Sequence, residues 1–168
     1  MTQAAPDGFE PMAFDPDANF IGVNGPLYRR IGPDGLRLGF RVAPRHCNLA
    51  MVCHGGMLTT LADMQLSLGA RHAAGLDLML PTVSLSIDFM GPVGIGCWVE
   101  GSTELLTTTR TLVFAQCRLL ADGLAAVRAN GVFRQAKRSK PCRRSIPGPA
   151  RVAGALLSQG GRCQRWQY

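Results

Sequence analysis

In the segment TVSLSIDFM at residues 82–90, polar and hydrophobic residues alternate strictly from Thr82 to Phe89. Val83, Leu85, Ile87 and Phe89 fall on one side of the chain, and the polar residues between them fall on the other. Because successive side chains of a strand point to opposite faces of a sheet, this alternation predicts a strand with one buried face.

Three further apolar runs follow, at residues 97–109, 110–121 and 124–134, and each predicts a strand. The dipeptide Asp122-Gly123 separates the last two runs, and Asp-Gly is a strong signal for a tight hairpin turn. The four strands can therefore pair as an antiparallel meander.

The N-terminal part of the chain divides into two segments. Residues 1–26 contain four prolines and no hydrophobic period, which predicts an irregular N-terminal arm. Residues 27–42 read LYRRIGPDGLRLGFRV. They predict two short strands on either side of a Gly-Pro-Asp-Gly turn.

The segment between residue 42 and the predicted strand at 82–90 has the period of a helix, which we expect from about Gly56 to Ala74. Two apolar rows run along it: Met57, Leu61, Met64 and Leu68, and Leu58, Ala62, Leu66 and Ala73. Four of its polar residues gather in one stripe at helical spacing: Thr59, Thr60, Asp63 and Ser67. A surface helix would have a broader polar half. We therefore expect an α+β fold in which a curved antiparallel sheet wraps a long central helix. The polar stripe either faces water or forms a site or an interface.

The composition describes one globular domain. The chain has 168 residues, of which 46% are hydrophobic, enough for one core and too few for two domains to be expected. No apolar run reaches the roughly 18 residues that a membrane-spanning helix requires. Residues 1–20 lack the basic and apolar regions of a secretory signal. We therefore expect a cytoplasmic protein.

The net charge of +7 comes from the C-terminal tail. Residues 137–168 hold eight basic residues and no acidic one, which leaves ten basic and eleven acidic residues, a net charge of −1, in residues 1–136. This near-neutral body does not predict a nucleic-acid partner. We expect the tail to be a disordered extension, with a basic arm for anionic groups such as CoA phosphate or RNA as the alternative. The chain then comprises the arm 1–26, one domain at 27–136 and the tail 137–168.

The cysteines indicate a reducing compartment. The chain has six: Cys47, Cys53, Cys97, Cys117, Cys142 and Cys163. They form no Cys-x-x-Cys pair and have no zinc-type spacing with histidine, so we expect no metal site. Cys53 next to His54 is a candidate thiol nucleophile beside its base. Sequence neighbours seldom point to the same spot, however, and the pattern does not favour this arrangement.

Asn48, the HGG run at residues 54–56 and Asp63 stand before TVSLSIDFMGP and, later, TRTLVFA and GVF. Together these motifs resemble the hotdog-fold acyl-CoA thioesterases of the phenylacetate-pathway (PaaI-like) group, over about residues 27–135. The resemblance implies a hotdog fold, with a sheet of about five to six strands around the helix. It also implies that two subunits join their sheets edge to edge, as a homodimer or a dimer of dimers, with active sites across the interface.

Thioester hydrolysis makes sense of these residue types. By resemblance, the backbone N–H of Gly55 at the positive end of the helix and the side-chain amide of Asn48 stabilise the oxyanion. His54 orients the loop. Asp63 is either the general base for water or a nucleophile that forms a mixed anhydride, and the sequence does not choose between the two.

Four other residues complete the candidate site. Thr82 falls where the family often places a hydroxyl that orients the attacking water, although a β-branched residue is also ordinary in a strand. Gly56, Arg110 and Arg128 are candidates for contacts with coenzyme A, the arginines because its phosphates attract guanidinium groups. Plain solvation is the alternative for both arginines.

The resemblance therefore predicts an enzyme that hydrolyses an acyl-CoA to a free acid and coenzyme A, with no cofactor because CoA is part of the substrate. A hotdog acyl-CoA hydratase or dehydratase and a non-catalytic acyl-CoA-binding protein are the alternatives. The arrangement of Asn48, His54 and Asp63 fits hydrolysis better. Residues 1–26 are too short and too rich in proline for the DNA-binding helices that hotdog regulators usually carry. The acyl group, and dimer versus tetramer, stay open.

Overall fold

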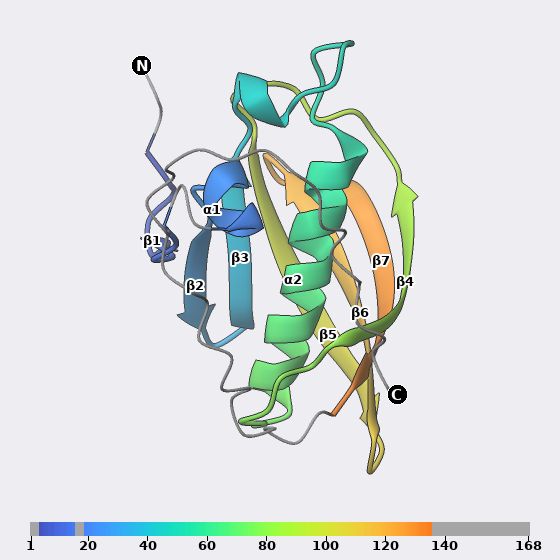
Figure 1. The fold of residues 1–168 in the computed structure, drawn as a ribbon. Coiled ribbons are helices and arrows are strands. Elements are labelled where there is room, and N and C mark those ends of the chain that lie inside the picture. Colours follow the sequence, from blue (N-terminus) through green and yellow to red (C-terminus); the bar gives the residue numbers. More distant parts are fainter. Residues whose placement is uncertain (1–3, 16–18, 136–168) are drawn as a thin grey trace, which may run out of the picture.

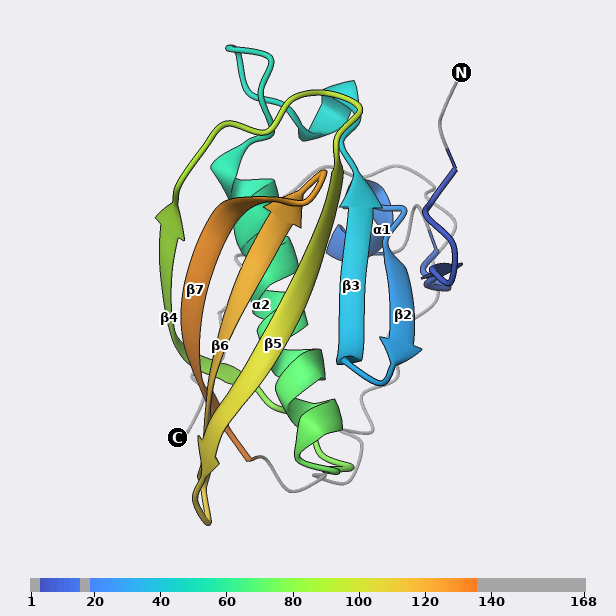
Figure 2. The same ribbon diagram turned by 180° about the vertical axis from the view of Figure 1, so that it is seen from behind.

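The structure, a computed structural model, describes residues 4–15 and 19–135. It contains one antiparallel sheet of seven strands in the order β1-β2-β3-β5-β6-β7-β4. The strands are β1 (Glu10–Pro11), β2 (Tyr28–Gly32), β3 (Gly35–Arg41), β4 (Thr82–Phe89), β5 (Trp98–Thr108), β6 (Leu112–Ala121) and β7 (Leu124–Arg134). The long helix α2 (Gly55–Ala73) packs along the concave face of the sheet (Figures 1 and 2). The predicted α+β architecture is confirmed.

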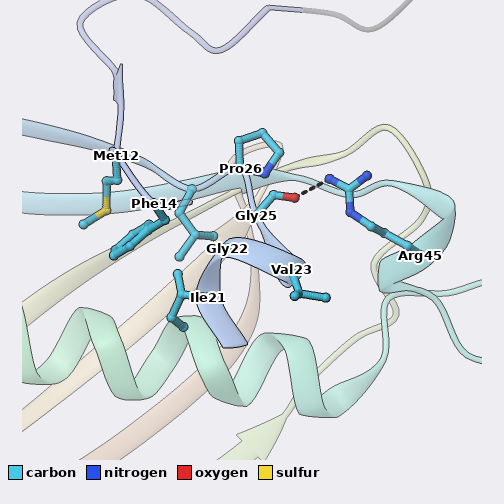
Figure 3. A pocket seen from close by; sticks show the side chains of 9 residues that line it. Met12, Phe14, Ile21, Gly22, Val23, Gly25, Pro26 and Arg45 are labelled. Atoms are coloured by element: carbon cyan, nitrogen blue, oxygen red, sulfur yellow. Dashed lines mark hydrogen bonds between the residues drawn. The ribbon is translucent and has the colours of Figure 1, made fainter. Parts of the chain in front are cut away.

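The N-terminal arm, for which the sequence predicts no regular element, contributes two short ones. β1 pairs with β2, so the sheet has seven strands where about five to six were expected. The short helix α1 (Phe20–Asn24) begins after Asn19, whose side-chain oxygen accepts a hydrogen bond from the N–H of Gly22 at 2.9 Å. Figure 3 shows α1 above α2 with Ile21 pointing toward α2, and this side chain packs against the core.

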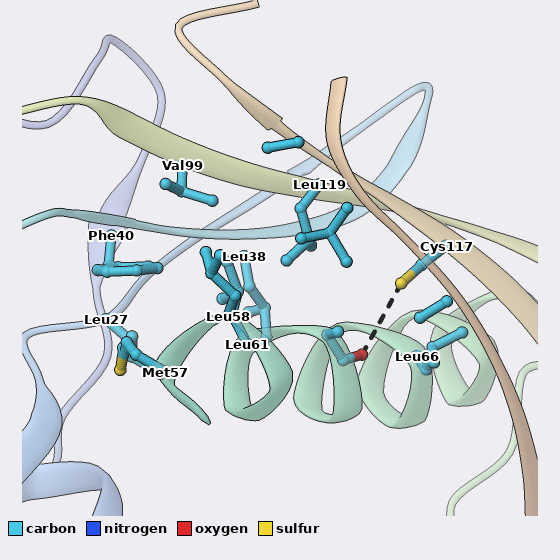
Figure 4. Packing of buried hydrophobic residues seen from close by; sticks show 14 of the residues in the cluster. Leu27, Leu38, Phe40, Met57, Leu58, Leu61, Leu66, Val99, Cys117 and Leu119 are labelled. Carbon is cyan, nitrogen blue, oxygen red and sulfur yellow. Dashed lines mark hydrogen bonds between the residues drawn. The ribbon is translucent and has the colours of Figure 1, made fainter. Parts of the chain in front are cut away.

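The core lies between α2 and the concave face of the sheet (Figure 4). Its largest fully buried apolar side chains come from α2, from the inward-facing positions of the strands and from the residue directly before β2: Leu27, Leu38, Phe40, Leu61, Leu66, Val99, Val113, Leu119, Val127 and Phe133. The two predicted apolar rows of the helix therefore largely face the sheet. Met64 and Leu68 are half-buried, and Ala73 is exposed at the end of α2.

One polar side chain, Gln65, is fully buried among these apolar residues. β3 and β5 pair only from Gly39 onward, so the backbone of Leu36 and Leu38 has no strand partner on that side. The Gln65 amide fills the gap: its oxygen accepts from the N–H of Leu38 at 2.7 Å, and its nitrogen donates to the Leu36 carbonyl at 2.9 Å. The same nitrogen donates to Thr103 Oγ1 at 2.8 Å. Gln65 thus ties α2 to both strands at the point where they diverge.

β4 is a strand as predicted, but the prediction of one buried face is wrong at two of its four apolar positions. Leu85 and Ile87 are half-buried, whereas Val83 is 60% exposed and Phe89 is 51% exposed. The reason is that β4 is the last strand in the sheet order. A register shift between Thr82 and Ser84 also interrupts the alternation there.

The hairpin between β6 and β7 turns at Asp122 and Gly123, which have φ angles of 45° and 85° as the Asp-Gly signal predicts. The proposed tail 137–168 lies outside the described residues. Of the helices in residues 4–15 and 19–135, none is both long and apolar enough to cross a lipid bilayer.

Candidate active site

The start of α2 is organised by His54, the residue that caps it. The Nδ1 atom of His54 accepts a hydrogen bond from the N–H of Gly56 at 2.8 Å. The backbone N–H of His54 donates to the carbonyl of His46 at 2.7 Å. Because its Nδ1 is committed to the helix, the imidazole positions the turn, which fits the orienting role expected for His54. The same bond occupies the N–H of Gly56, one of the expected CoA contacts.

Gly55 is the first residue of α2, and its N–H has no intrahelical acceptor. Among the described residues, none accepts a hydrogen bond from this N–H. A Cβ added at Gly55 would lie 3.2 Å from the ring of Phe89, at the end of β4, so a side chain there would crowd the ring. Gly55 therefore presents a free donor at the positive end of a long helix.

Asn48 sits at the start of the tight turn that precedes α2. Its side-chain oxygen accepts hydrogen bonds from the N–H groups of Ala50 and Val52, at 2.9 and 3.4 Å. These bonds fix the orientation of the amide. Within the described part of the chain, its NH₂ group has no acceptor. The amide can therefore donate to a ligand without breaking the turn.

Asp63 and Thr82 form a direct pair between α2 and β4. The hydroxyl of Thr82 donates a hydrogen bond to Oδ1 of Asp63 at 2.7 Å. Asp63 is half-buried on the polar stripe of the helix, and Thr82 is the exposed first residue of its strand. The structure thus brings these two predicted site residues together and leaves the second carboxylate oxygen of Asp63 without a protein donor among the described residues.

The Asp63–Thr82 pair lines a cavity of about 400 Å³. The remaining lining is largely apolar: Phe20 and Ile21 of α1, Met64 of α2 and Leu85 of β4, with Thr59 and Thr60 beside them. A carboxylate at an apolar cavity is an arrangement suited to an apolar substrate with one polar reacting group.

A second cavity, of about 320 Å³, lies at the start of α2 and shares Phe20 and Thr60 with the first. Arg45, His54 and Gly56 also line it. Arg45 donates a hydrogen bond to the carbonyl of Gly25, at the end of α1 (Figure 3). A third cavity, of about 510 Å³, is lined by residues of the N-terminal arm and α1 and also by Arg45 (Figure 3).

Sequence reasoning missed Phe20 and Arg45. Phe20 stands in a proline-rich stretch with no period, and nothing in the pattern indicates that this stretch folds back over α2. Arg45 lies only nine residues before His54 in the sequence. That proximity to the glycine pair is the one signal by which it could have been found.

The two predicted arginines lie away from these cavities. Arg110 was expected in a strand, but it is exposed in the turn between β5 and β6, at the end of the sheet opposite the start of α2 (Figure 2). Arg128 is in β7, but its neighbours Val127 and Ala129 are buried against the helix, so Arg128 faces the opposite side of the sheet. There it pairs with Asp88 at 2.8 Å. Neither arginine meets Asp63 or Gly55 of the same chain.

Cys53 does not have the features of a thiol nucleophile. Its side chain is 5% exposed, and burial raises its pKa to about 12. The imidazole of the neighbouring His54 is turned to the helix start. No group of three or more His, Cys, Asp or Glu side chains within the described ranges could hold a metal ion.

Comparisons with known proteins agree with this fold. The family described as Thioesterase superfamily matches residues 51–126. A Pseudomonas aeruginosa protein named "putative esterase" is 30% identical over 129 residues, which cover 76% of this chain and 95% of that protein.

Solved structures extend the comparison. A mutant of the phenylacetic acid degradation protein PaaI from Thermus thermophilus has a TM-score of 0.58 and 21% identity, and the match covers 66% of this chain and 93% of that one. A hypothetical thioesterase protein from Streptococcus pneumoniae, solved with coenzyme A, has a TM-score of 0.59 and 20% identity over 67% and 91% of the two chains. These likenesses establish the hotdog fold.

The class that the fold and the comparisons define is therefore the hotdog thioesterases. The chain belongs to the thioesterase superfamily. This membership supports a role as a hydrolase of thioesters.

Proposed function

We propose that this protein hydrolyses acyl-CoA thioesters to free acids and coenzyme A in the cytoplasm. The observation that carries the proposal is the Asp63–Thr82 pair at the wall of a largely apolar cavity. A carboxylate oriented by a hydroxyl is suited to direct water at a carbonyl carbon. The apolar lining is suited to an acyl chain or an aromatic ring. Coenzyme A bound to a protein of the same fold supports the nature of the leaving group.

The first step is addition at the thioester carbonyl. Water attacks the carbonyl carbon while Asp63 takes its proton, or the carboxylate itself attacks and the resulting anhydride is then hydrolysed. In both routes the carbonyl oxygen becomes negative, and the N–H of Gly55 and the amide of Asn48 donate to it. One such donor contributes about 3 kcal/mol to lowering the barrier. The intermediate collapses by expelling the CoA thiolate.

The geometry of one helix supports a site made by two chains. Gly55 and Asp63 both lie on α2, eight residues apart, and a helix rises 1.5 Å per residue, so the two positions are about 12 Å apart along its axis. A carboxylate and a donor that act on one carbonyl must both lie near that carbonyl. We therefore place Gly55 of one chain opposite Asp63 of the partner subunit.

We infer that the two subunits of this dimer pair along the free edge of β4. In the described chain β4 pairs with β7 on one side only, and Val83, Phe89 and Met90 are exposed beside that edge. An eight-residue edge strand with exposed apolar residues is prone to pair with another strand. Pairing two copies of β4 would extend the sheet across both subunits and bring the starts of their helices toward the interface.

Arg45 replaces Arg110 as the first candidate for contact with an anionic group of coenzyme A. It lines the cavity at the start of α2, where the thioester would lie if Gly55 binds its oxygen. The guanidinium group of Arg45 uses one N–H for its hydrogen bond to the Gly25 carbonyl, and its other N–H groups can donate to a phosphate.

A panel of acyl-CoA esters tests the reaction class. Release of the CoA thiol is followed with a chromogenic disulfide, with an enzyme-only blank because the six cysteines of the chain also react. The proposal expects steady turnover of at least one short-chain, medium-chain or arylacetyl ester. Hydration of an enoyl-CoA without thiol release would identify a hydratase instead, and tight binding without turnover would identify a binding protein.

A further inference from the structure

Cys47 and Cys53 face each other across the turn that carries Asn48. The backbone N–H of Asn48 donates to the carbonyl of Val52 at 2.9 Å, and that of His54 donates to the carbonyl of His46 at 2.7 Å. Between these two hydrogen bonds, Cys47 and Cys53 form an antiparallel bridge. The two cysteines are thus directly opposite one another on adjacent segments.

The hydrogen-bond pattern defines the kind of pair. The bonds join the residues before and after the cysteines, and the cysteines exchange none, which is the non-hydrogen-bonded pair of an antiparallel ladder. Opposite residues in such a pair have Cα atoms about 4.5 Å apart and side chains on the same face. A disulfide requires Cα atoms roughly 4.4 to 6.8 Å apart. The backbone of Cys47 and Cys53 therefore already has a spacing that a disulfide accepts.

The two thiols differ in access. Cys47 is half-buried and lines the cavity at the start of α2, whereas Cys53 is 5% exposed. Burial, together with the nearby Cys47 thiol, raises the pKa of Cys53 to about 12. A small oxidant therefore reaches Cys47 first, and Cys53 reacts only with a partner already beside it.

We propose that Cys47 and Cys53 are a redox-active pair that a low-molecular-weight disulfide, such as glutathione disulfide, converts to an intramolecular disulfide. In the first step the Cys47 thiolate attacks one sulfur of glutathione disulfide, forms a mixed disulfide and releases one glutathione thiolate. In the second step the sulfur of Cys53, already beside the mixed disulfide, attacks the sulfur of Cys47 as its thiol proton passes to the departing glutathione thiolate. The two protein thiols lose two protons and two electrons, and glutathione disulfide is reduced to two thiols.

This modification lies next to the candidate active site but does not depend on the proposed hydrolysis. The disulfide closes the turn at residues 48–52, whose side-chain hydrogen bonds orient Asn48, and it occupies part of the wall of the cavity at the helix start. Oxidation would therefore make the turn that carries Asn48 more rigid.

Mass spectrometry of the folded, full-length protein tests the proposal. The protein is incubated with glutathione disulfide at mildly alkaline pH, unfolded, alkylated with iodoacetamide and digested with trypsin. Arginines at positions 45 and 71 bound one peptide, 46–71, whose only cysteines are Cys47 and Cys53. The proposal expects this peptide to become two hydrogens lighter and to take no alkyl group. Peptides that hold Cys97 and Cys117 should each still take one.

Two variants control for order and specificity. In Cys53→Ser the reaction should stop at a glutathione adduct on Cys47. In Cys47→Ser the buried Cys53 should stay reduced and be alkylated after unfolding. The proposal is overturned if peptide 46–71 of the wild type remains doubly alkylated, if it accumulates as a stable glutathione adduct, or if it is cross-linked to Cys142 or Cys163.

Discussion

Thr82 Oγ1 lies 2.7 Å from Oδ1 of Asp63, and this hydrogen bond joins the first residue of β4 to the polar stripe of α2. It fixes the carboxylate toward the apolar cavity. The bond also links α2, which carries Asp63, to β4, the strand at the edge of the sheet where we propose that two subunits pair.

Replacing Thr82 by valine removes the hydroxyl and keeps the shape. A hydrogen bond to a charged group contributes about 1.5 to 3 kcal/mol, so we expect kcat/KM of Thr82→Val to fall by roughly ten- to a hundredfold. Thr82→Ser keeps the donor and should stay within a few-fold of the wild type. Equal activity of the valine and serine variants would show that the bond has no catalytic role.

Replacing Gly55 by proline removes the N–H donor and adds a Cβ that crowds Phe89, as any side chain at this position would. Proline is favoured at the first position of a helix, and His54 already has φ −62° and ψ 135°, the extended conformation that a following proline prefers. We expect kcat of Gly55→Pro to fall about a hundredfold or more below that of Gly55→Ala, which keeps the N–H. The alanine variant measures the crowding of Phe89 alone. If both variants have the same kcat, the N–H of Gly55 does not bind the oxyanion.

Replacing Gln65 by leucine should destabilise the fold without touching the candidate site. The N–H of Leu38 and the carbonyl of Leu36 would lose their buried partner, at a cost of about 2 to 4 kcal/mol in the free energy of unfolding. Urea denaturation measures this loss. Gln116→Leu is the matched control, because Gln116 bonds to the exposed Glu104 on the other face, and its effect should be within about 0.5 kcal/mol.

His46 should make stability depend on pH. Burial lowers the pKa of His46 below its usual value of 6.5, and the charge of Arg45 acts in the same direction. Its Nδ1 accepts from the N–H of Ala43 at 3.0 Å, so the neutral ring carries its proton on Nε2, which is 3.0 Å from the carbonyl of Asn24. Since the folded state favours the neutral ring, this contribution is complete above pH 6.5 and is lost as the pH falls below that value.

Thermal unfolding across roughly pH 8 to pH 5 tests this dependence. Tm of the wild type should fall more steeply toward pH 5 than Tm of His46→Asn, which lacks the titrating ring. His72→Asn, at an exposed position near the end of α2, should follow the wild type. Parallel curves for the wild type and His46→Asn would contradict the assignment.

The sequence predicts most of the fold because its periods are strong. The alternation around Leu85 and Ile87 predicts a strand, and the apolar rows of α2 predict a helix packed against a sheet. The dipeptide Asp122-Gly123 predicts the hairpin turn. The burial of Val83 and Phe89 was mispredicted because alternation defines a face but not whether another element covers it. That depends on the position of β4 in the sheet order, which is a property of the whole topology.

Most of the predicted site residues lie close together in the sequence, and Thr82, on a separate strand, was predicted from the family resemblance alone. Asn48, His54, Gly55 and Asp63 fall within one turn and one helix, so their spacing is informative. Phe20 reaches the site through the path of the arm, which no local pattern records. The role of Gln65 was missed for a similar reason, because it depends on a gap between β3 and β5 that only their pairing reveals.

Complementation between two inactive variants tests most directly the claim that each site combines Gly55 of one chain with Asp63 of the partner subunit. Asp63→Asn and Gly55→Pro are purified separately, unfolded together in equal amounts and refolded, and hybrid dimers are isolated with two different affinity tags. A hybrid then contains one site with both native groups and one site with neither. In the refolded mixture before separation, random pairing makes about half of the dimers hybrids, and each hybrid has one intact site out of two. Because the interface of a twofold dimer is reciprocal, this mixture should regain about a quarter of wild-type kcat. Hybrid dimers that form but stay as inactive as their parents would contradict the shared site, and so would full activity of Asp63→Asn alone.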